Sequence, residues 1–257
     1  NDQSRKATCR MARASLSRVC DAIAAHASCR MRPEILSSFS QMPERIAAGA
    51  VHVAWAPPLV FQSLSKRRLA VAVSCPRRPG GLAYHSAIFS RARSRFRDVA
   101  DLDGARAAWV DPASLSGYVL ARGWLLKNGC DPARNLAREQ FLKTHSAVAR
   151  AVIGGDADIA STYANVDPKT SRIIDAGWSE IGMSSADVQV LTTIGPVPSD
   201  AIVVSTRLAD PVRNAIRAGL GTLTGSALAS VRVLFRAERF EPPPAGYLAS
   251  LGGLTEK

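Results

Sequence analysis

The stretch 109–129, WVDPASLSGYVLARGWLLKNG, joins an apolar strand to a helical pattern through a short polar loop. The strand ends at Asp111-Pro112, and Gly117 opens a run of apolar residues at helical spacing. Ser114 and Ser116 stand where the helix begins. Two interpretations are open, because serine hydroxyls cap helix N-termini and the same donors bind anions there.

The alternation of strand and helix continues on both sides of this stretch. Strands are expected at 50–56, 68–75, 83–90, 106–111, 138–143, 157–163, 187–194 and 201–205, with an ambiguous one at 28–36. Helices are expected at 10–27, 42–48, 116–128, 146–153, 211–223 and 226–236, and another begins at Pro57-Pro58. Strands that alternate with helices form parallel sheets of βαβ units, so the pattern predicts an α/β protein.

Two breaks rich in proline or glycine, 76–83 and 195–200, separate apolar strands and are typical of crossings between domains. The segment between two crossings is an inserted domain, here 84–192. The flanking segments 1–83 and 193–257 are then expected to fold together as the other lobe. The sequence therefore predicts two doubly wound α/β lobes, joined by two hinge strands, with a cleft between them.

Doubly wound sheets bind ligands beyond the carboxyl ends of their strands, where the free N–H groups of a helix start favour an anion. Four strand ends qualify: 55–58, 111–117, 143–146 and 163–167. At the second, Ser114 and Ser116 each offer a hydroxyl and Gly117 allows a close approach to the backbone. Leu115, between the two serines, contributes its N–H alone.

The third strand end carries Thr144, His145 and Ser146. A single histidine is more often a core or surface residue than a ligand-binding one. At a helix N-terminus, however, a neutral histidine is able to donate an N–H to a phosphoryl oxygen. Thr144 or Ser146 is the expected N-cap.

Four more residues occupy positions where a cleft is expected. Trp55 lies at the first of the four strand ends, that of the strand 50–56, and is either a core residue or a wall of the cleft. Tyr163 follows the fourth strand. Tyr84 stands at the first crossing and Asp200 at the second. Asp200 either initiates a turn or binds a cationic group of a ligand.

The net charge of +12 raises the possibility of nucleic-acid binding. The arginines are scattered, and their one dense cluster, 91–97, lacks the interleaved aromatic residues of a single-strand binder. We therefore expect small anions as partners and no nucleic acid.

Signals for metal binding, cofactor binding and catalysis are weak. The five cysteines form no CxxC pair, and the four histidines form no cluster. No GxSxG, HExxH or Walker A motif is present. A hydrolase built on Ser116 and His145 would lack a third, orienting residue. The sequence therefore predicts no metal, no cofactor and no enzymatic activity.

Five segments together resemble the periplasmic phosphonate, phosphite and phosphate-binding proteins of ABC transporters. They are GAVHVAWAPPLVFQSL (49–64), YHSAIFSR (84–91), DLDGARAAWVDPASLSGYVLARGWLLKNGCDP (101–132), THSAVARAVIGGDADIASTY (144–163) and IGPVPSDAIVV (194–204). They are similar to that family's VDVAW strand, crossing strand, VDPxSxSGY loop, SHxxxxxAV helix and return crossing, in the family's order. The resemblance spans about two-thirds of the chain.

The resemblance implies a type II periplasmic-binding-protein fold whose two lobes close on a ligand. Four residues would hold the phosphoryl group: Ser114, Leu115 through its backbone, Ser116 and His145. Tyr84 and the segment around Trp55 would line the cleft, and Asp200 would meet the distal substituent of the ligand.

The sequence departs from the family pattern at three places. The family commonly has Ser-Thr-Ser in the anion loop, and Leu115 removes one hydroxyl. A lost hydrogen bond to an anion costs about 1.5–3 kcal/mol, so we expect a weaker affinity or a different ligand. His52 replaces the usual aspartate, and the family's opening VGxxP strand is not recognisable before residue 10.

These observations predict a monomeric solute-binding protein that captures a phosphonate, phosphite or phosphate anion between its lobes and delivers it to an ABC permease. The resemblance implies a periplasmic location, although no signal peptide is seen in this chain. A cytoplasmic ligand-sensing or regulatory domain on the same fold is the alternative.

Overall fold

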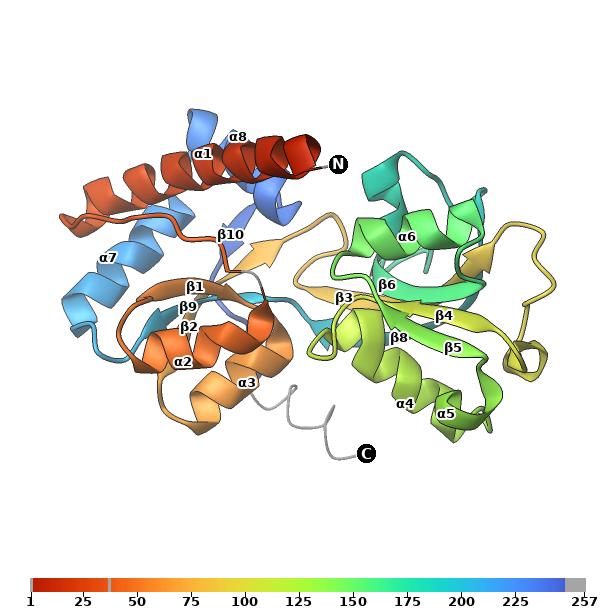
Figure 1. Cartoon of the computed structure of the whole chain (residues 1–257). Helices are drawn as coiled ribbons and strands as arrows, with labels where there is room; N and C mark the ends of the chain where they lie inside the picture. The colour runs from red at the N-terminus through yellow and green to blue at the C-terminus, as the bar shows by residue number, and fades with distance from the viewer. Residues whose placement is uncertain (1, 37, 248–257) are drawn as a thin grey trace. The chain divides into compact units, whose positions relative to one another are not determined.

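The computed structural model of the chain describes residues 2–36 and 38–247. The chain forms two compact units: unit 1 comprises Asn1–Leu82 and Pro198–Lys257, and unit 2 comprises Ala83–Val197. The unit boundaries lie one residue from the first predicted domain boundary and five residues from the second. Figure 1 gives the course of the chain through both units.

The sheet of unit 1 has four strands in the order β1-β9-β2-β10. Their bounds are Val53–Ala56, Ala201–Ser205, Ala70–Arg77 and Arg239–Glu241, respectively. All three neighbouring pairs are antiparallel. The antiparallel pairing arises because β9 returns from unit 2 and enters the sheet between β1 and β2, so it runs against both.

Helices cover both faces of the unit 1 sheet. One face packs against α1 (Asp2–Ala27), α7 (Asp210–Gly221) and α8 (Gly225–Phe235), and the other against α2 (Met42–Ala47) and α3 (Pro58–Lys66). A 3-10 turn, Phe39–Gln41, precedes α2. Among the described residues, no single helix is long and apolar enough to cross a membrane. The pair α7 and α8, bent by 90°, passes that test by length and composition.

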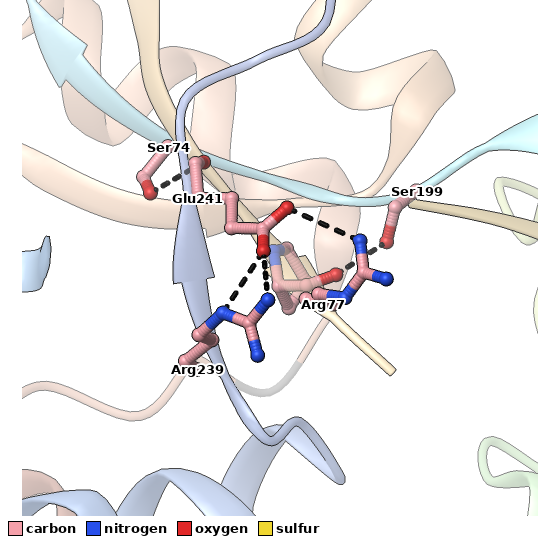
Figure 2. A network of polar contacts seen from close by, with 6 residues as sticks. Ser74, Arg77, Ser199, Arg239 and Glu241 are labelled. Atoms are coloured by element: carbon pink, nitrogen blue, oxygen red, sulfur yellow. Dashed lines mark hydrogen bonds and ion pairs between the residues drawn. The ribbon is translucent and has the colours of Figure 1, made fainter. Parts of the chain in front are cut away.

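A polar network around Glu241 fixes β10 to β2 (Figure 2). Arg239 Nε donates to Glu241 Oε1 at 2.9 Å, and Arg77 Nη1 donates to Oε2 at 3.4 Å. The Ser74 hydroxyl donates to the backbone carbonyl of Glu241 at 2.8 Å. This network attaches the segment that follows α8 to the edge of the sheet.

The sheet of unit 2 has the strand order β5-β4-β6-β3-β8, with β7 paired to β6. The bounds are β3 Ala83–Arg91, β4 Arg106–Trp109, β5 Arg138–Phe141, β6 Ile159–Val166, β7 Ile173–Ala176 and β8 Val188–Pro198. β4 is parallel to both β5 and β6, whereas β3 and β7 are antiparallel to β6. The unit 2 sheet is therefore mixed, and its parallel part, β5-β4-β6, extends inwards from one edge.

The helices of unit 2 also lie on both faces of its sheet. On one face lie a π-helical turn, η3 (Leu115–Val119), and α4 (Leu120–Lys127). On the other lie α6 (His145–Gly154) and a 3-10 turn, η4 (Gly177–Ile181). Two short elements complete the unit: the 3-10 turn Val99–Leu102 and α5 (Pro132–Asn135).

The structure corrects several predicted elements. Parallel pairing is right for β5-β4-β6 but wrong in unit 1, where every described pair is antiparallel. The ambiguous segment 28–36 forms no strand, and β7 and β10 were not predicted. The missed strands have only four and three residues, too few to show an alternating pattern.

Candidate anion-binding site

Several predicted site residues lie at one edge of the unit 2 sheet. β4, β5 and β6 are parallel, so their carboxyl ends meet there. β3 runs against β6 with His85 opposite Ala164, which brings the start of β3 to the same edge. The loops that follow β4 and β5 are hydrogen bonded, since Lys143 N donates to the Val110 carbonyl at 2.8 Å. This edge therefore carries Tyr84, Ser114–Gly117, Thr144, His145 and Tyr163.

Hydrogen bonds between residues two or three positions apart shape the loop between β4 and η3. Asp111 Oδ1 accepts from the N–H of Ala113 at 2.9 Å, and the Asp111 carbonyl accepts from Ser114 N at 2.9 Å. The Ser114 hydroxyl accepts from Gly117 N at 3.1 Å. The capping interpretation of Ser114 is thus correct, while the hydroxyl hydrogen stays available for donation to an anion.

The requirement for glycine at position 117 has a steric cause. A Cβ atom at Gly117 would lie 2.4 Å from Val110 Cγ2 and 2.8 Å from Ser114 Oγ. Glycine therefore allows η3 to pack directly on the end of β4. The predicted close approach of an anion to Gly117 is not needed to explain this residue.

Ser116 is held by two buried hydroxyls from neighbouring strands. Ser86 Oγ on β3 donates to the Ser116 carbonyl at 2.7 Å, and Ser161 Oγ on β6 donates to it at 2.6 Å. Both serines are fully buried. A carbonyl has two lone pairs, so it accommodates both donors. The acceptor side of this peptide is therefore bound within unit 2.

The donors around Ser116 have no partner among the residues that the structure describes. The Ser116 hydroxyl and the N–H groups of Leu115 and Ser116 form no hydrogen bond with them. Free N–H groups are expected at the first turn of a helix, where no earlier carbonyl is in reach. The Leu115 side chain is buried and 2% exposed, so this residue offers its backbone N–H alone.

His145 begins α6 and is oriented by the strand next to it. Thr144 is the N-cap, because its hydroxyl accepts from Ala147 N at 3.1 Å. His145 Nδ1 lies 2.9 Å from the Thr162 hydroxyl, and its ring meets the ring of Tyr163 edge-on, with centroids 4.9 Å apart. These contacts fix the direction of the imidazole beside the middle of β6. Tyr163 lies within this strand, rather than after it as the sequence predicted, because β6 continues to Val166.

Close packing around His145 depends on a second glycine. A Cβ atom at Gly177 would lie 2.0 Å from Thr162 Oγ1 and 3.0 Å from His145 Cβ. Glycine at this position lets η4 pack tightly beside α6 and the end of β6.

The two tyrosines at this edge differ in their surroundings. The Tyr163 hydroxyl donates to Glu180 Oε1 at 3.0 Å, so its proton is already engaged. Tyr84 is buried, with 6% of its surface exposed. Beside it, burial lowers the pKa of His85, and His85 Nδ1 has no hydrogen-bond partner among the described residues. His85 is therefore neutral near pH 7.

Trp55 lies in unit 1 and belongs to the core on the side of α1 and α8. Its ring meets Phe235 edge-on with centroids 5.4 Å apart. Its indole N–H is buried and without a hydrogen-bond partner within the described part of the chain. These contacts agree with the core interpretation of Trp55 and leave one donor unused.

Asp200, also in unit 1, forms a largely buried ion pair. Arg78 Nη2 donates to Asp200 Oδ2 at 2.8 Å, and Arg78 Nη1 donates to the hydroxyl of Ser199 at 2.7 Å. The Arg78 and Asp200 side chains are 11% and 13% exposed. Neither sequence interpretation of Asp200, turn initiation or binding of a cationic ligand group, included this partner.

Sequence reasoning missed the residues that support the site. Ser86, Ser161 and Thr162 are fully buried polar residues within otherwise apolar strands. That contrast is visible in AYHSAIFS and IASTY and is the signal that could have identified them, because a buried hydroxyl requires a partner. Arg78 lies in the turn-forming PRRPGG segment and gave no comparable signal.

A shallow hollow of about 190 Å³ lies elsewhere in unit 2, lined by Val99, Ala100, Asp103, Asn128, Gly129, Cys130 and Asn135. It lies near the start of β4, at the opposite end of that strand from the candidate site. Within the described ranges, no group of three metal-ligating side chains is present. All five cysteines are free thiols.

Comparison with known proteins assigns the family. Residues 11–244 match the family of ABC transporter phosphonate periplasmic substrate-binding proteins. The chain belongs to this family. The resemblance found in the sequence is therefore confirmed, and members of the family are substrate-binding proteins of transport systems rather than enzymes.

Solved structures of similar proteins share the fold of this phosphonate-binding family member. A binding protein component of an ABC phosphonate transporter from Pseudomonas aeruginosa is 15% identical, with a TM-score of 0.77, over 94% of this chain and 80% of that chain. PhnD1 from Prochlorococcus marinus, in complex with methylphosphonate, is 11% identical, with a TM-score of 0.73, over 93% and 90%. A Xanthomonas citri protein bound to ATP is 21% identical, with a TM-score of 0.71, over 93% and 90%. The predicted periplasmic-binding-protein fold is confirmed.

Proposed function

We propose that this chain is the solute-binding protein of an ABC transporter and binds a small phosphorus oxyanion. The ligand oxygens would accept from the hydroxyls of Ser114 and Ser116, the N–H groups of Leu115 and Ser116, and the imidazole of His145. The observation that carries this proposal is the pattern of hydrogen bonds at Ser116. Its carbonyl is bound by two buried serines, whereas its hydroxyl and N–H lack partners among the described residues.

Two helix N-termini support an anionic ligand at this edge. η3 and α6 begin beyond the carboxyl ends of parallel strands, on opposite faces of the sheet. Each supplies free N–H groups and a positive partial charge. A tetrahedral oxyanion has several acceptor oxygens, so it is able to accept from both helix starts together.

His145 would act as a neutral donor. If the Thr162 hydroxyl donates to Nδ1, the ring hydrogen is on Nε2, which is then the atom that donates to the ligand.

The Arg78–Asp200 ion pair narrows the ligand class. The resemblance assigns Asp200 to the distal substituent of the ligand, yet its carboxylate is already paired with a guanidinium at 2.8 Å. A ligand ammonium would have to displace that partner. We therefore propose that phosphite, phosphate or methylphosphonate binds more tightly than an aminoalkylphosphonate.

Isothermal titration calorimetry tests this function with methylphosphonate, phosphite, phosphate, aminoethylphosphonate, ATP and sulfate. Ser116→Ala is expected to weaken binding of the best ligand by about tenfold or more, because a hydrogen bond to a charged group is lost. Ser185→Ala is the matched control, since Ser185 is exposed and lies away from the site strands. The absence of heat with every ligand, in a folded protein, would contradict the proposed function.

The remaining features are proposed from family membership. The chain would act in the periplasm as a monomer, close its two units around the ligand, dock on a membrane permease and perform no catalysis. Fractionation of cells that express the complete gene tests the location. Hydrolysis assays with phosphoesters test the absence of catalysis.

A further inference from the structure

The positive charge of the chain is concentrated in unit 1. This unit contains 20 of the 33 Lys and Arg residues but 9 of the 21 Asp and Glu residues, so its net charge is +11. Unit 2 holds the other 13 basic and 12 acidic residues, a net charge of +1. The candidate anion site lies in unit 2, so the binding of a small anion there does not account for the charge of unit 1.

Much of this charge is on one helical layer. α1 packs against both α7 and α8 (Figure 1), and the three helices bury Ile23, Ile216 and Val231 on one face of the sheet. Together they contain eight basic and three acidic residues. The acidic Asp210 is itself paired with Arg213 of the same helix.

Five arginines of this layer are exposed, and we call them the basic helical surface: Arg10, Arg13, Arg18, Arg217 and Arg232. Their side chains form no hydrogen bond or ion pair with any described residue. Two large apolar side chains of the same helices are also exposed. Met11 on α1 is 71% exposed and Val233 on α8 is 73% exposed. The layer thus combines unpaired cations with apolar side chains that contact solvent.

We propose that the basic helical surface binds an anionic phospholipid membrane. Lys and Arg residues near an anionic bilayer surface each strengthen binding about fivefold, and apolar side chains insert between the headgroups. Binding would keep the protein at the membrane, where the permease of the proposed function lies. The proposal does not depend on the identity of the ligand that unit 2 binds.

The composition of this surface favours lipid over nucleic acid. Single-stranded nucleic acids are held by aromatic side chains that stack on the bases. Among the described residues of unit 1, the large hydrophobic side chains that are exposed are Met11, Ile35, Val71 and Val233, and none is aromatic. Aliphatic side chains beside arginines are suited to a headgroup layer instead.

Vesicle co-sedimentation of the whole chain tests the proposal. Binding is expected to phosphatidylcholine vesicles that contain about one-third phosphatidylglycerol, but not to pure phosphatidylcholine vesicles. About 0.5 M NaCl should release the protein, because salt screens exposed charges. The triple variant Arg10→Gln, Arg13→Gln, Arg18→Gln should bind at least tenfold more weakly.

A matched variant separates a local surface from overall charge. Arg91→Gln, Arg150→Gln, Arg172→Gln removes three exposed arginines of unit 2 and lowers the net charge equally. It is expected to bind vesicles within twofold of the parent chain. Circular dichroism and titration with the best anion should show that both variants stay folded and bind the ligand.

Three outcomes would overturn the proposal. The parent chain does not bind phosphatidylglycerol vesicles, or both triple variants lose binding equally, or a DNA oligonucleotide binds tighter than the vesicles at the same salt concentration. The last result would assign the basic helical surface to nucleic acid. None of these three outcomes would affect the proposed function, because anion binding is tested separately by calorimetry.

Discussion

At the scale of single residues, Gly117 determines how the anion loop packs. A methyl group at this position would lie 2.4 Å from Val110 Cγ2, inside any normal contact distance. Gly117→Ala is therefore expected to lower the free energy of unfolding by about 1–3 kcal/mol, because the loop must move away from β4. The same movement would displace Ser116 and weaken anion binding. Urea denaturation and calorimetry measure the two effects.

Gly123 provides the matched control for that substitution. It lies within α4, and a Cβ atom there would meet nothing within 4 Å. Gly123→Ala is expected to stabilise the protein by about 0.5–1 kcal/mol, since alanine favours the helix. Equal stabilities for the two variants would contradict the steric role of Gly117.

At this scale, residue type predicted the helix starts but not the contacts of each side chain. Thr144 and Ser114 were recognisable as possible caps because hydroxyls accept from free N–H groups. The partner of Asp200 was not recognisable, because Arg78 is 122 residues away in the chain. The buried contacts of Ser86 and Ser161 with Ser116 likewise depend on strand register, which the local sequence does not encode.

At the scale of elements, Asp158 joins β4 to the start of β6. Its carboxylate accepts from Arg106 Nε at 2.9 Å, from Nη2 at 2.9 Å and from the Arg106 backbone N–H at 2.8 Å. The hydrogen bonds from Arg106 hold the pKa of Asp158 below its ordinary value. Because the carboxylate is favoured in the folded state, its contribution to stability is present above about pH 4 and is lost as the pH falls through the lowered pKa.

Asp158→Asn is therefore expected to destabilise the protein by about 1–3 kcal/mol at pH 7. The difference from the parent should shrink as the pH falls below about 4 and through the lowered pKa of the folded parent's carboxylate. Thermal unfolding followed by circular dichroism from pH 7 to pH 3 measures this trend. Asp156→Asn is the control: Asp156 is exposed, so a change within about 0.5 kcal/mol is expected. A difference independent of pH would contradict the role of the Asp158 charge.

Periodicity predicted most elements but not their partners or directions. The apolar run at β9 (Ala201–Ser205) was recognised, whereas its antiparallel pairing to β1 and β2 was not. The direction of β9 is set by the return of the chain from unit 2, which is a property of topology rather than of local sequence. β4, β5 and β6 follow one another through helices, so their parallel pairing was predictable.

At the scale of the whole molecule, the order of the motifs carried more information than composition. The net charge of +12 suggested nucleic acid, yet the family match over residues 11–244 assigns a transport protein. The net charge becomes informative when it is counted for each unit separately, because unit 1 carries +11 of the total of +12. That division depends on the return crossing near Pro198, where the chain passes back into unit 1.

The final prediction concerns how ligand binding stabilises the two units. A ligand that binds the folded state alone raises the free energy of unfolding by about 2.7 kcal/mol at a hundredfold excess over its Kd. If both units contact the ligand, as the family resemblance implies, both should be stabilised. If the donors of unit 2 suffice, unit 1 should be unaffected. We expect both to be stabilised.

The tryptophans allow this to be measured for each unit. Trp55 is the one tryptophan of unit 1, while Trp109, Trp124 and Trp178 belong to unit 2. The Trp55→Phe variant keeps only the tryptophans of unit 2, so its fluorescence melting curve reports on unit 2. Subtracting this curve from that of the parent leaves the signal of Trp55, which reports on unit 1. Saturating methylphosphonate should raise both midpoints in the parent and in Ser185→Ala, and should raise both by a smaller amount in Ser116→Ala. A rise confined to unit 2 would mean that its own hydroxyls and N–H groups hold the anion without unit 1.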